Sequence, residues 1–192
     1  MKDSYITNPY SSKFKFGLIQ LCIFLPQIGD FITLVKSIGL LKKIMNNKFW
    51  LLNIHRTILA EKKDTNGMYD LVEGVTQSST ATPLHVHTQY IETIYVVEGE
   101  LTIYMEPNKT VLQPGNSYTI QKGHPHQLKA TGNHQTKTLT IFSPSGFANV
   151  IRQAGIAGEA NEHPDTVTDM GLFKKFSEDI GDLTLPIGTV YV

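Results

Sequence analysis

The sequence predicts an all-β domain of the sandwich or barrel type, preceded by a helical arm and followed by helices. From about residue 48, short runs rich in branched and aromatic residues recur roughly every ten residues, separated by Gly, Pro and Asn. Before and after this region, apolar residues follow helical spacing instead. We therefore divide the chain into an N-terminal arm (residues 1–46), a β-domain (47–146) and a C-terminal helical extension (147–192).

The composition is that of a globular protein. The chain has 192 residues, 41% hydrophobic and 18% charged, which is enough to bury a core. Its 17 basic and 17 acidic side chains cancel, whereas a nucleic-acid-binding surface normally carries a basic excess, so we expect no nucleic-acid partner. A single cysteine, Cys22, excludes an internal disulfide framework and a Cys-rich zinc module. Any metal must therefore be held by His, Asp and Glu.

The arm has a charge of its own. Residues 1–46 hold six Lys and two Asp, a net charge of +4, whereas the remaining residues hold 11 basic and 15 acidic side chains, a net charge of −4. Apolar residues at helical spacing fill residues 16–41, and Pro26, Gly29 and Asp30 interrupt them. This pattern predicts two short amphipathic helices or one kinked helix, and disfavours a membrane-spanning segment.

Two interpretations of residues 16–41 remain open. They pack on their own domain or on a second subunit, or they lie on an anionic membrane surface. The segment also lacks a good secretory cleavage site. We therefore expect a cytoplasmic homodimer, with peripheral membrane or partner contact through residues 16–41 as the alternative.

The β-domain divides into short strands joined by tight turns. Gly99 and Gly115 lie in turns where a positive φ is expected. The helical extension should begin with a helix over residues 147–154 and continue with one over 168–180. The expected strands cover residues 50–60, 68–73, 92–97, 101–105, 118–120 and 139–142, with Leu128 in a further strand.

Residues with metal-binding chemistry gather in one stretch. His85 and His87 are two apart, and residues two apart in a strand point to the same face. Glu92 begins the next strand after a short turn, so its carboxylate can return to that face, and His126 offers a third imidazole. Three imidazoles and one carboxylate suit a divalent transition metal and leave positions open for substrate. We predict one such ion per chain, bound by these four residues.

The other histidines carry weaker signals. His124 lies two residues before His126, but Pro125 between them disrupts a regular strand, so the same-face argument does not extend to His124. We interpret it as a turn residue or a residue that supports a ligand, and leave open whether it joins the metal shell. Outside the motifs lie three more histidines, which we interpret as surface or structural residues: His55, His134 and His163.

The stretch that contains His85, His87 and Glu92 resembles the first sequence motif of the cupin superfamily. That motif reads G-x5-H-x-H-x(3,4)-E-x6-G, and His85, His87, Glu92 and Gly99 match it in register. Ser79 stands where the family has its opening glycine. The departure concerns a loop position and leaves the ligand positions intact.

The second cupin motif, G-x5-P-x-G-x2-H-x3-N, follows after a short segment. Gly115, Gly123 and His126 match it, whereas Gln121 replaces the proline and Ala130 the asparagine. The chain is similar to single-domain cupins of the Cupin_2 type, and to those described as quercetin-dioxygenase-like, over roughly residues 50–188. The resemblance implies a small antiparallel, jelly-roll-like barrel with the metal inside.

The resemblance also implies a function. Quercetinase-like cupins are mononuclear metal-dependent dioxygenases, so we expect action on a small flavonol-like or enolic substrate, with Fe, Mn, Ni, Cu, Co or Zn as the metal. Glu92 would be the catalytic residue that accepts the proton of the substrate hydroxyl. The alternative is a non-catalytic cupin that binds a small ligand as a sensor or accessory protein. A sugar isomerase or epimerase is less favoured, because the residues expected to face inward (Ile94, Val96 and Leu128) are apolar.

Overall fold

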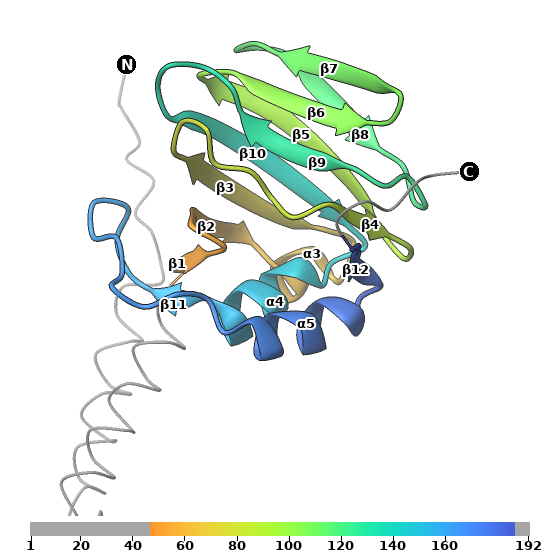
Figure 1. The fold of residues 1–192 in the computed structure, drawn as a ribbon. Helices are drawn as coiled ribbons and strands as arrows, with labels where there is room; N and C mark the ends of the chain where they lie inside the picture. The colour runs from red at the N-terminus through yellow and green to blue at the C-terminus, as the bar shows by residue number, and fades with distance from the viewer. Residues whose placement is uncertain (1–46, 187–192) are drawn as a thin grey trace, which may run out of the picture. The chain divides into compact units, whose positions relative to one another are not determined.

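The computed structural model describes residues 47–186, so the predictions for the arm lie outside the described residues. Within this range the chain forms antiparallel strands and three helices (Figure 1). The strands are β1 (Lys48–Leu51), β2 (Ile54–Ala60), β3 (Asp70–Thr76), β4 (His85–His87), β5 (Ile91–Glu98), β6 (Leu101–Met105), β7 (Asn108–Leu112), β8 (Ser117–Ile120), β9 (Gln127–Ala130), β10 (Thr136–Ser143), β11 (Ile156–Ala157) and β12 (Asp182–Thr184). The helices are α3 (Lys62–Thr65), α4 (Phe147–Ala154) and α5 (Met170–Glu178).

Three sheets make up the β-domain. The largest has seven strands in the order β11-β1-β2-β3-β10-β5-β8, and the smaller sheets have the orders β7-β6-β9 and β12-β4. Neighbours such as β3 and β10, or β5 and β10, are far apart in sequence, which is typical of a jelly-roll connection rather than a simple meander. The predicted fold class, a small cupin-like β-barrel with helices after it, is confirmed.

Strand β5 shows the predicted alternation of faces. Ile94 and Val96 are buried, whereas Tyr95 and Val97 are exposed. Because side chains alternate along a strand, the burial of Ile94 and Val96 also brings Glu92 to the interior. The barrel interior is filled by an apolar cluster of six buried residues: Ile94, Val96, Leu101, Ile103, Leu112 and Ile120.

A second core lies between the strands at one end of the barrel and helices α4 and α5. It includes Phe49, Ile58, Phe142, Ile151 and Phe173, all buried. Figure 1 shows both helices running side by side across this end. The helices thus give the β-domain an apolar cover on the side where strands β1 and β2 enter the sheet.

The start of α4 is fixed by a carboxylate from the sheet. Buried Asp70, in β3, accepts hydrogen bonds from the main-chain N–H groups of Gly146 and Ala148, at 2.7 and 2.9 Å. These N–H groups have no partner within the helix, so the carboxylate takes the role of a cap. Helix α4 covers residues 147–154 as predicted, and α5 is slightly shorter than the predicted 168–180.

The predicted strand over residues 50–60 is two strands. Leu52 and Asn53 both have positive φ, 53° and 60°, and turn β1 back onto β2. Such a turn usually contains Asn-Gly or Asp-Gly, so the leucine concealed it in the sequence. By contrast, Gly99 and Gly115 have the positive φ values predicted for them.

None of the helices in the part of the chain that the structure describes has the length and the apolar character needed to span a membrane.

Candidate metal centre

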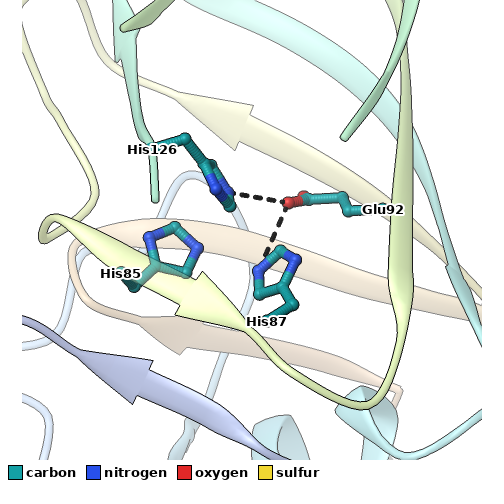
Figure 2. Close-up of side chains that lie close together, drawn as sticks. All are labelled: His85, His87, Glu92 and His126. Atoms are coloured by element: carbon teal, nitrogen blue, oxygen red, sulfur yellow. Dashed lines mark ion pairs between the residues drawn. The ribbon is translucent and has the colours of Figure 1, made fainter. Parts of the chain in front are cut away.

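The four predicted ligands come together inside the barrel. His85 and His87 lie on β4, Glu92 lies on β5, and His126 lies immediately before β9. Figure 2 shows the four side chains converging, with Glu92 facing the three imidazoles. One ligand atom from each residue can be chosen so that all four atoms lie within 4.8 Å of one another.

The main chain fastens two of these residues to each other. The N–H of His85 donates to the carbonyl of His126 at 3.0 Å, and the N–H of His126 donates to the carbonyl of His85 at 2.8 Å. Their rings lie 4.2 Å apart between centroids. Because both donors and both acceptors are used, the spacing of the two imidazoles is set by the backbone rather than by the side chains alone.

Backbone carbonyls also fix which ring nitrogen carries the proton. His85 Nδ1 lies 2.9 Å from the carbonyl of Pro83, and His126 Nδ1 lies 2.9 Å from the carbonyl of His124. A carbonyl oxygen only accepts, so each Nδ1 must be the protonated donor of the neutral ring. The Nε2 lone pairs of His85 and His126 are thereby left free to bind a metal.

The cluster contains buried polar atoms without partners. Glu92 Oε2 lies 3.5 Å from His126 Nε2 and 3.7 Å from His87 Nε2, longer than a good hydrogen bond. Glu92 Oε2 and His126 Nε2 have no hydrogen-bond partner among the described residues, although both are buried. Ligands that each lie about 2.0–2.2 Å from one ion are separated by roughly 3–4 Å. The donor set and its spacing therefore fit a bound divalent metal.

Burial keeps the imidazoles in the form that binds metal. Burial, reinforced by the neighbouring imidazoles, lowers the pKa of His85 to about 3. Burial lowers the pKa of His87 to about 4, although the Glu92 charge opposes this change. Burial alone would raise the pKa of Glu92, but the contact with His126 and the charges of the imidazoles bring it down to about 2. Two neutral imidazoles and a carboxylate anion thus face one another at neutral pH, ready to bind a metal.

The remaining histidines lie elsewhere. His124 is exposed and stays outside the cluster, but its main-chain carbonyl orients the His126 ring. His55 is buried and its Nε2 lies 3.2 Å from the carbonyl of Gly158, a structural role. His134 is exposed, and the exposed His163 packs its ring against Trp50.

Sequence analysis missed the residues that surround the cluster. The Tyr90 ring stacks on His87, with centroids 4.2 Å apart, and its hydroxyl donates to Asp182 Oδ2 at 3.0 Å. Burial raises the pKa of Asp182 to about 7, with the Glu92 charge acting in the same direction. Asp182 is 95 residues from His87 in sequence and pairs with it between β12 and β4, so no local pattern could have revealed the contact.

Strand β12 reaches the site through a tight connection. Gly181 has a φ of +69°, and a Cβ at this position would collide with Thr88 Oγ1 and lie 2.7 Å from the Gln89 side chain. Only glycine fits both the backbone conformation and the space. This residue therefore lets the chain leave α5 and pair directly with the strand that carries His85 and His87.

A cavity opens beside the cluster. Its volume is about 40 Å³, room for a few water molecules. Arg56 contributes a charged group to its wall, which the predicted apolar interior did not include. Its apolar wall is formed by Leu51, Leu52, Tyr90, Leu128, Phe142, Phe147 and Phe173. Water or one small group of a ligand could thus reach His85, His87 and Glu92, which line the same cavity, whereas a whole aromatic ligand requires the cavity to widen.

The segment that holds the cluster is similar to known proteins. Residues 73–142 match the family described as Cupin domain. The chain is 26% identical over 111 residues to quercetin 2,3-dioxygenase of Bacillus subtilis (strain 168), an alignment that covers 58% of this chain and 32% of the relative. The chain thus spans about a third of the length of this curated relative.

Solved structures are similar at lower identity. KdgF from Halomonas sp. aligns with a TM-score of 0.43 and 23% identity, covering 47% of this chain and 80% of that one. An RmlC-like cupin from Shewanella frigidimarina NCIMB 400 aligns with a TM-score of 0.45 and 19% identity, covering 53% and 86%.

The family match and the structure coincide in position. The matched segment contains β3 to β10 almost entirely, and both sequence motifs lie in it. Those motifs supply the four side chains that converge in the barrel. Residues 73–142 thus match a cupin domain in sequence, and the described residues have a cupin-like fold.

Proposed function

We propose that this protein is a mononuclear metal-dependent dioxygenase that acts on a small enolic substrate. The observation that carries the proposal is the cluster of three imidazoles and one carboxylate beside a small cavity with aromatic, aliphatic and polar side chains in its wall. The similarity to a quercetin 2,3-dioxygenase supports it. A bound divalent metal would supply Lewis acidity and a template that orients the substrate oxygen.

In this proposal each residue of the cluster has a stated task. His85, His87 and His126 bind the metal through ring nitrogens, two of them with the tautomer fixed by backbone carbonyls. Glu92 binds the metal and accepts the proton of the substrate's enolic hydroxyl on a carboxylate oxygen. The aromatic wall holds the substrate body and excludes water, while dioxygen is the oxidant and supplies both oxygen atoms that enter the product.

Aerobic turnover tests the proposal. Protein reconstituted in parallel with Fe, Mn, Ni, Cu, Co or Zn should consume dioxygen in the presence of flavonols or related enols, with at least one metal. Glu92→Gln should lower turnover strongly, because an amide cannot accept the proton. Full turnover by this variant would refute the role of Glu92 as base, and no dioxygen consumption with any metal would refute the dioxygenase.

A second candidate is a cupin that binds a small ligand without turnover. The cavity favours it equally, since a binding site and an active site have the same shape requirements. Ligand binding at the metal with no dioxygen uptake would distinguish it from the enzyme. A sugar isomerase or epimerase is the third candidate. The apolar residues Ile94, Val96 and Leu128 speak against it, but Arg56 adds a polar group to the cavity wall and so makes it more favourable than the sequence indicated.

For residues 16–41 we propose a docking role, argued from sequence alone. The apolar character of this segment and the +4 charge of residues 1–46 suit a second subunit of a homodimer or an anionic membrane surface. Deleting residues 1–46 should change the oligomer size or the binding to anionic vesicles. If the deletion changes neither, both interpretations of the segment are wrong.

A further inference from the structure

The two arginines of the chain have different surroundings. Arg152 lies in α4 and forms a two-point ion pair with Glu61, with distances of 2.9 and 3.0 Å. Arg56 lies in β2, and within the described range no carboxylate lies within ion-pair distance of its guanidinium. Its Nε is buried and has no hydrogen-bond partner in that range. Such a group costs free energy in the folded state unless something else satisfies it.

The fold makes room for this guanidinium. Gly74, opposite Arg56 on β3, would as an alanine place its Cβ only 3.0 Å from Thr138 Oγ1 and 3.2 Å from Arg56 Nη1. Glycine in the middle of a strand is unfavourable in itself, so its presence here indicates a close approach by another group. The neighbouring strand therefore leaves the space that the Arg56 side chain fills.

The position of Arg56 connects two hollows of the barrel. Arg56 lines the cavity that His85, His87 and Glu92 also line, and it lines a second, smaller cavity as well. Burial lowers the pKa of Arg56, and the negative charge of Glu92 opposes this change. The second hollow is lined by aliphatic and threonine side chains: Ile54, Thr76, Thr82, Ile94, Leu101, Leu128, Ala130, Thr138 and Thr140. A ligand group in the cavity beside the cluster therefore shares it with Arg56.

The charges of the site call for an anion. A divalent ion held by neutral imidazoles and the Glu92 carboxylate leaves a charge of +1, and Arg56, which stays protonated in proteins, adds another. Asp182 is the other acidic residue of the cavity wall and can offset one of these charges at most. At least one positive charge remains in a site walled by aromatic side chains, where uncompensated charge is costly.

We propose that Arg56 binds an anionic group of the ligand, most simply a carboxylate, while the enolic oxygen of the same ligand faces the metal cluster. The inference rests on the proposed function and narrows its substrate class to small enolic or hydroxy carboxylates in place of neutral flavonols. A guanidinium offers two parallel N–H donors that match a carboxylate, and such charged pairs are strong when shielded from water. Arg56 is thus a specificity-determining residue of the cavity.

Binding of a matched pair of probes tests this assignment without turnover. Salicylate and salicylamide share a hydroxyl-bearing aromatic ring but differ in charge, and their affinities are measured by calorimetry at neutral pH with metal-loaded and metal-free protein. The wild type should bind salicylate at least about tenfold more tightly than salicylamide, because only the carboxylate pairs with Arg56. Arg56→Met should abolish the preference with metal content unchanged, Arg56→Lys should keep part of it, and Arg152→Met, the matched control, should keep all of it.

The outcomes separate this proposal from the proposed function. The melting temperature of metal-free Arg56→Met should equal or exceed that of the wild type, because a half-buried charge without an ion-pair partner is removed, and this verifies that the variant is folded. A preference that survives in folded Arg56→Met, or no preference in the wild type, refutes the anion subsite. An Arg56-dependent preference without dioxygen consumption refutes the dioxygenase and leaves the subsite standing.

Discussion

His126 Nε2 and Glu92 Oε2 lie 3.5 Å apart in the barrel, both buried and neither hydrogen-bonded within the described residues. Burying two polar atoms in this way destabilises a protein unless a third partner joins them. A divalent metal between them, with His85 and His87 as further ligands, satisfies both atoms at once.

Metal analysis tests the four ligands. Protein purified without chelator should contain about one transition metal per chain, and the double variant His85→Ala, His87→Ala should lose it, because two of the four ligands are missing. Single replacement of His126 by Ala should lower metal affinity by a factor of about 10–100 or more. The matched control is His124→Ala, which removes an exposed imidazole outside the cluster and keeps the carbonyl that orients His126. Full metal content in the double variant would overturn the ligand assignment.

The stability of the metal-free protein should depend on pH in a defined direction. Burial lowers the pKa of His85 and His87 from 6.5 to about 3 and about 4, so the unfolded chain binds more protons than the folded one between these values. The stabilisation is therefore complete above pH 6.5 and is lost as the pH falls toward 4. Melting temperatures measured with a chelator present should fall over this range.

One carboxyl opposes this trend. The pKa of Asp182 is raised from 3.8 to about 7, so its contribution is greatest at low pH and is lost as the pH rises between these values. Because two imidazoles act against one carboxyl, acid should still destabilise the wild type, and Asp182→Asn should make the loss steeper. A melting temperature that stays constant or rises as the pH falls from 6.5 to 4 would contradict the lowered pKa values of His85 and His87.

Ser79 offers a stabilising substitution. This residue has a φ of +69°, a conformation that costs a non-glycine residue about 1 kcal/mol, and it stands where the cupin motif has glycine. Ser79→Gly should therefore raise the free energy of unfolding by about 0.5–1 kcal/mol, measured by denaturant titration. Ser78→Gly is the control: this residue does not have positive φ, and its hydroxyl donates to Gly132, so the change should destabilise. Destabilisation by Ser79→Gly would refute the backbone argument.

Gly181 and Gly115 form a matched pair. Both have positive φ, 69° and 90°, but a Cβ at Gly115 would meet no atom within 4 Å, whereas a Cβ at Gly181 collides with Thr88. Gly115→Ala should cost about 1 kcal/mol, and Gly181→Ala should cost roughly 1–3 kcal/mol more because a clash is added. Gly181→Ala should also weaken metal binding, because β12 pairs with the strand that carries His85 and His87. Equal costs for the two variants would show that β12 adapts freely.

Much of this protein follows from local patterns in the chain. Alternation in residues 92–97 predicted which side chains of β5 face inward, since one face of the strand is buried and the period of a strand is two. The spacing of His85, His87, Glu92 and His126 predicted the cluster, because the first two share a face and the motif places the other two on neighbouring segments. The hairpin at Leu52 and Asn53 escaped prediction because leucine rarely adopts positive φ, so the pair lacks the usual Asn-Gly or Asp-Gly signal.

Only the tertiary structure reveals contacts between residues that are distant in sequence. The tautomer of the His126 ring is set by the carbonyl of His124, two residues away, whereas the contact of Tyr90 with Asp182 joins residues 92 apart. Nothing in the sequence distinguishes Arg56 from an ordinary arginine in a strand. The role proposed for it depends on its tertiary surroundings, which are Gly74 beside it and the cavity that it lines. The reason is physical: a local pattern records which face of a strand is buried, whereas the charge balance of a cavity depends on every segment that lines it.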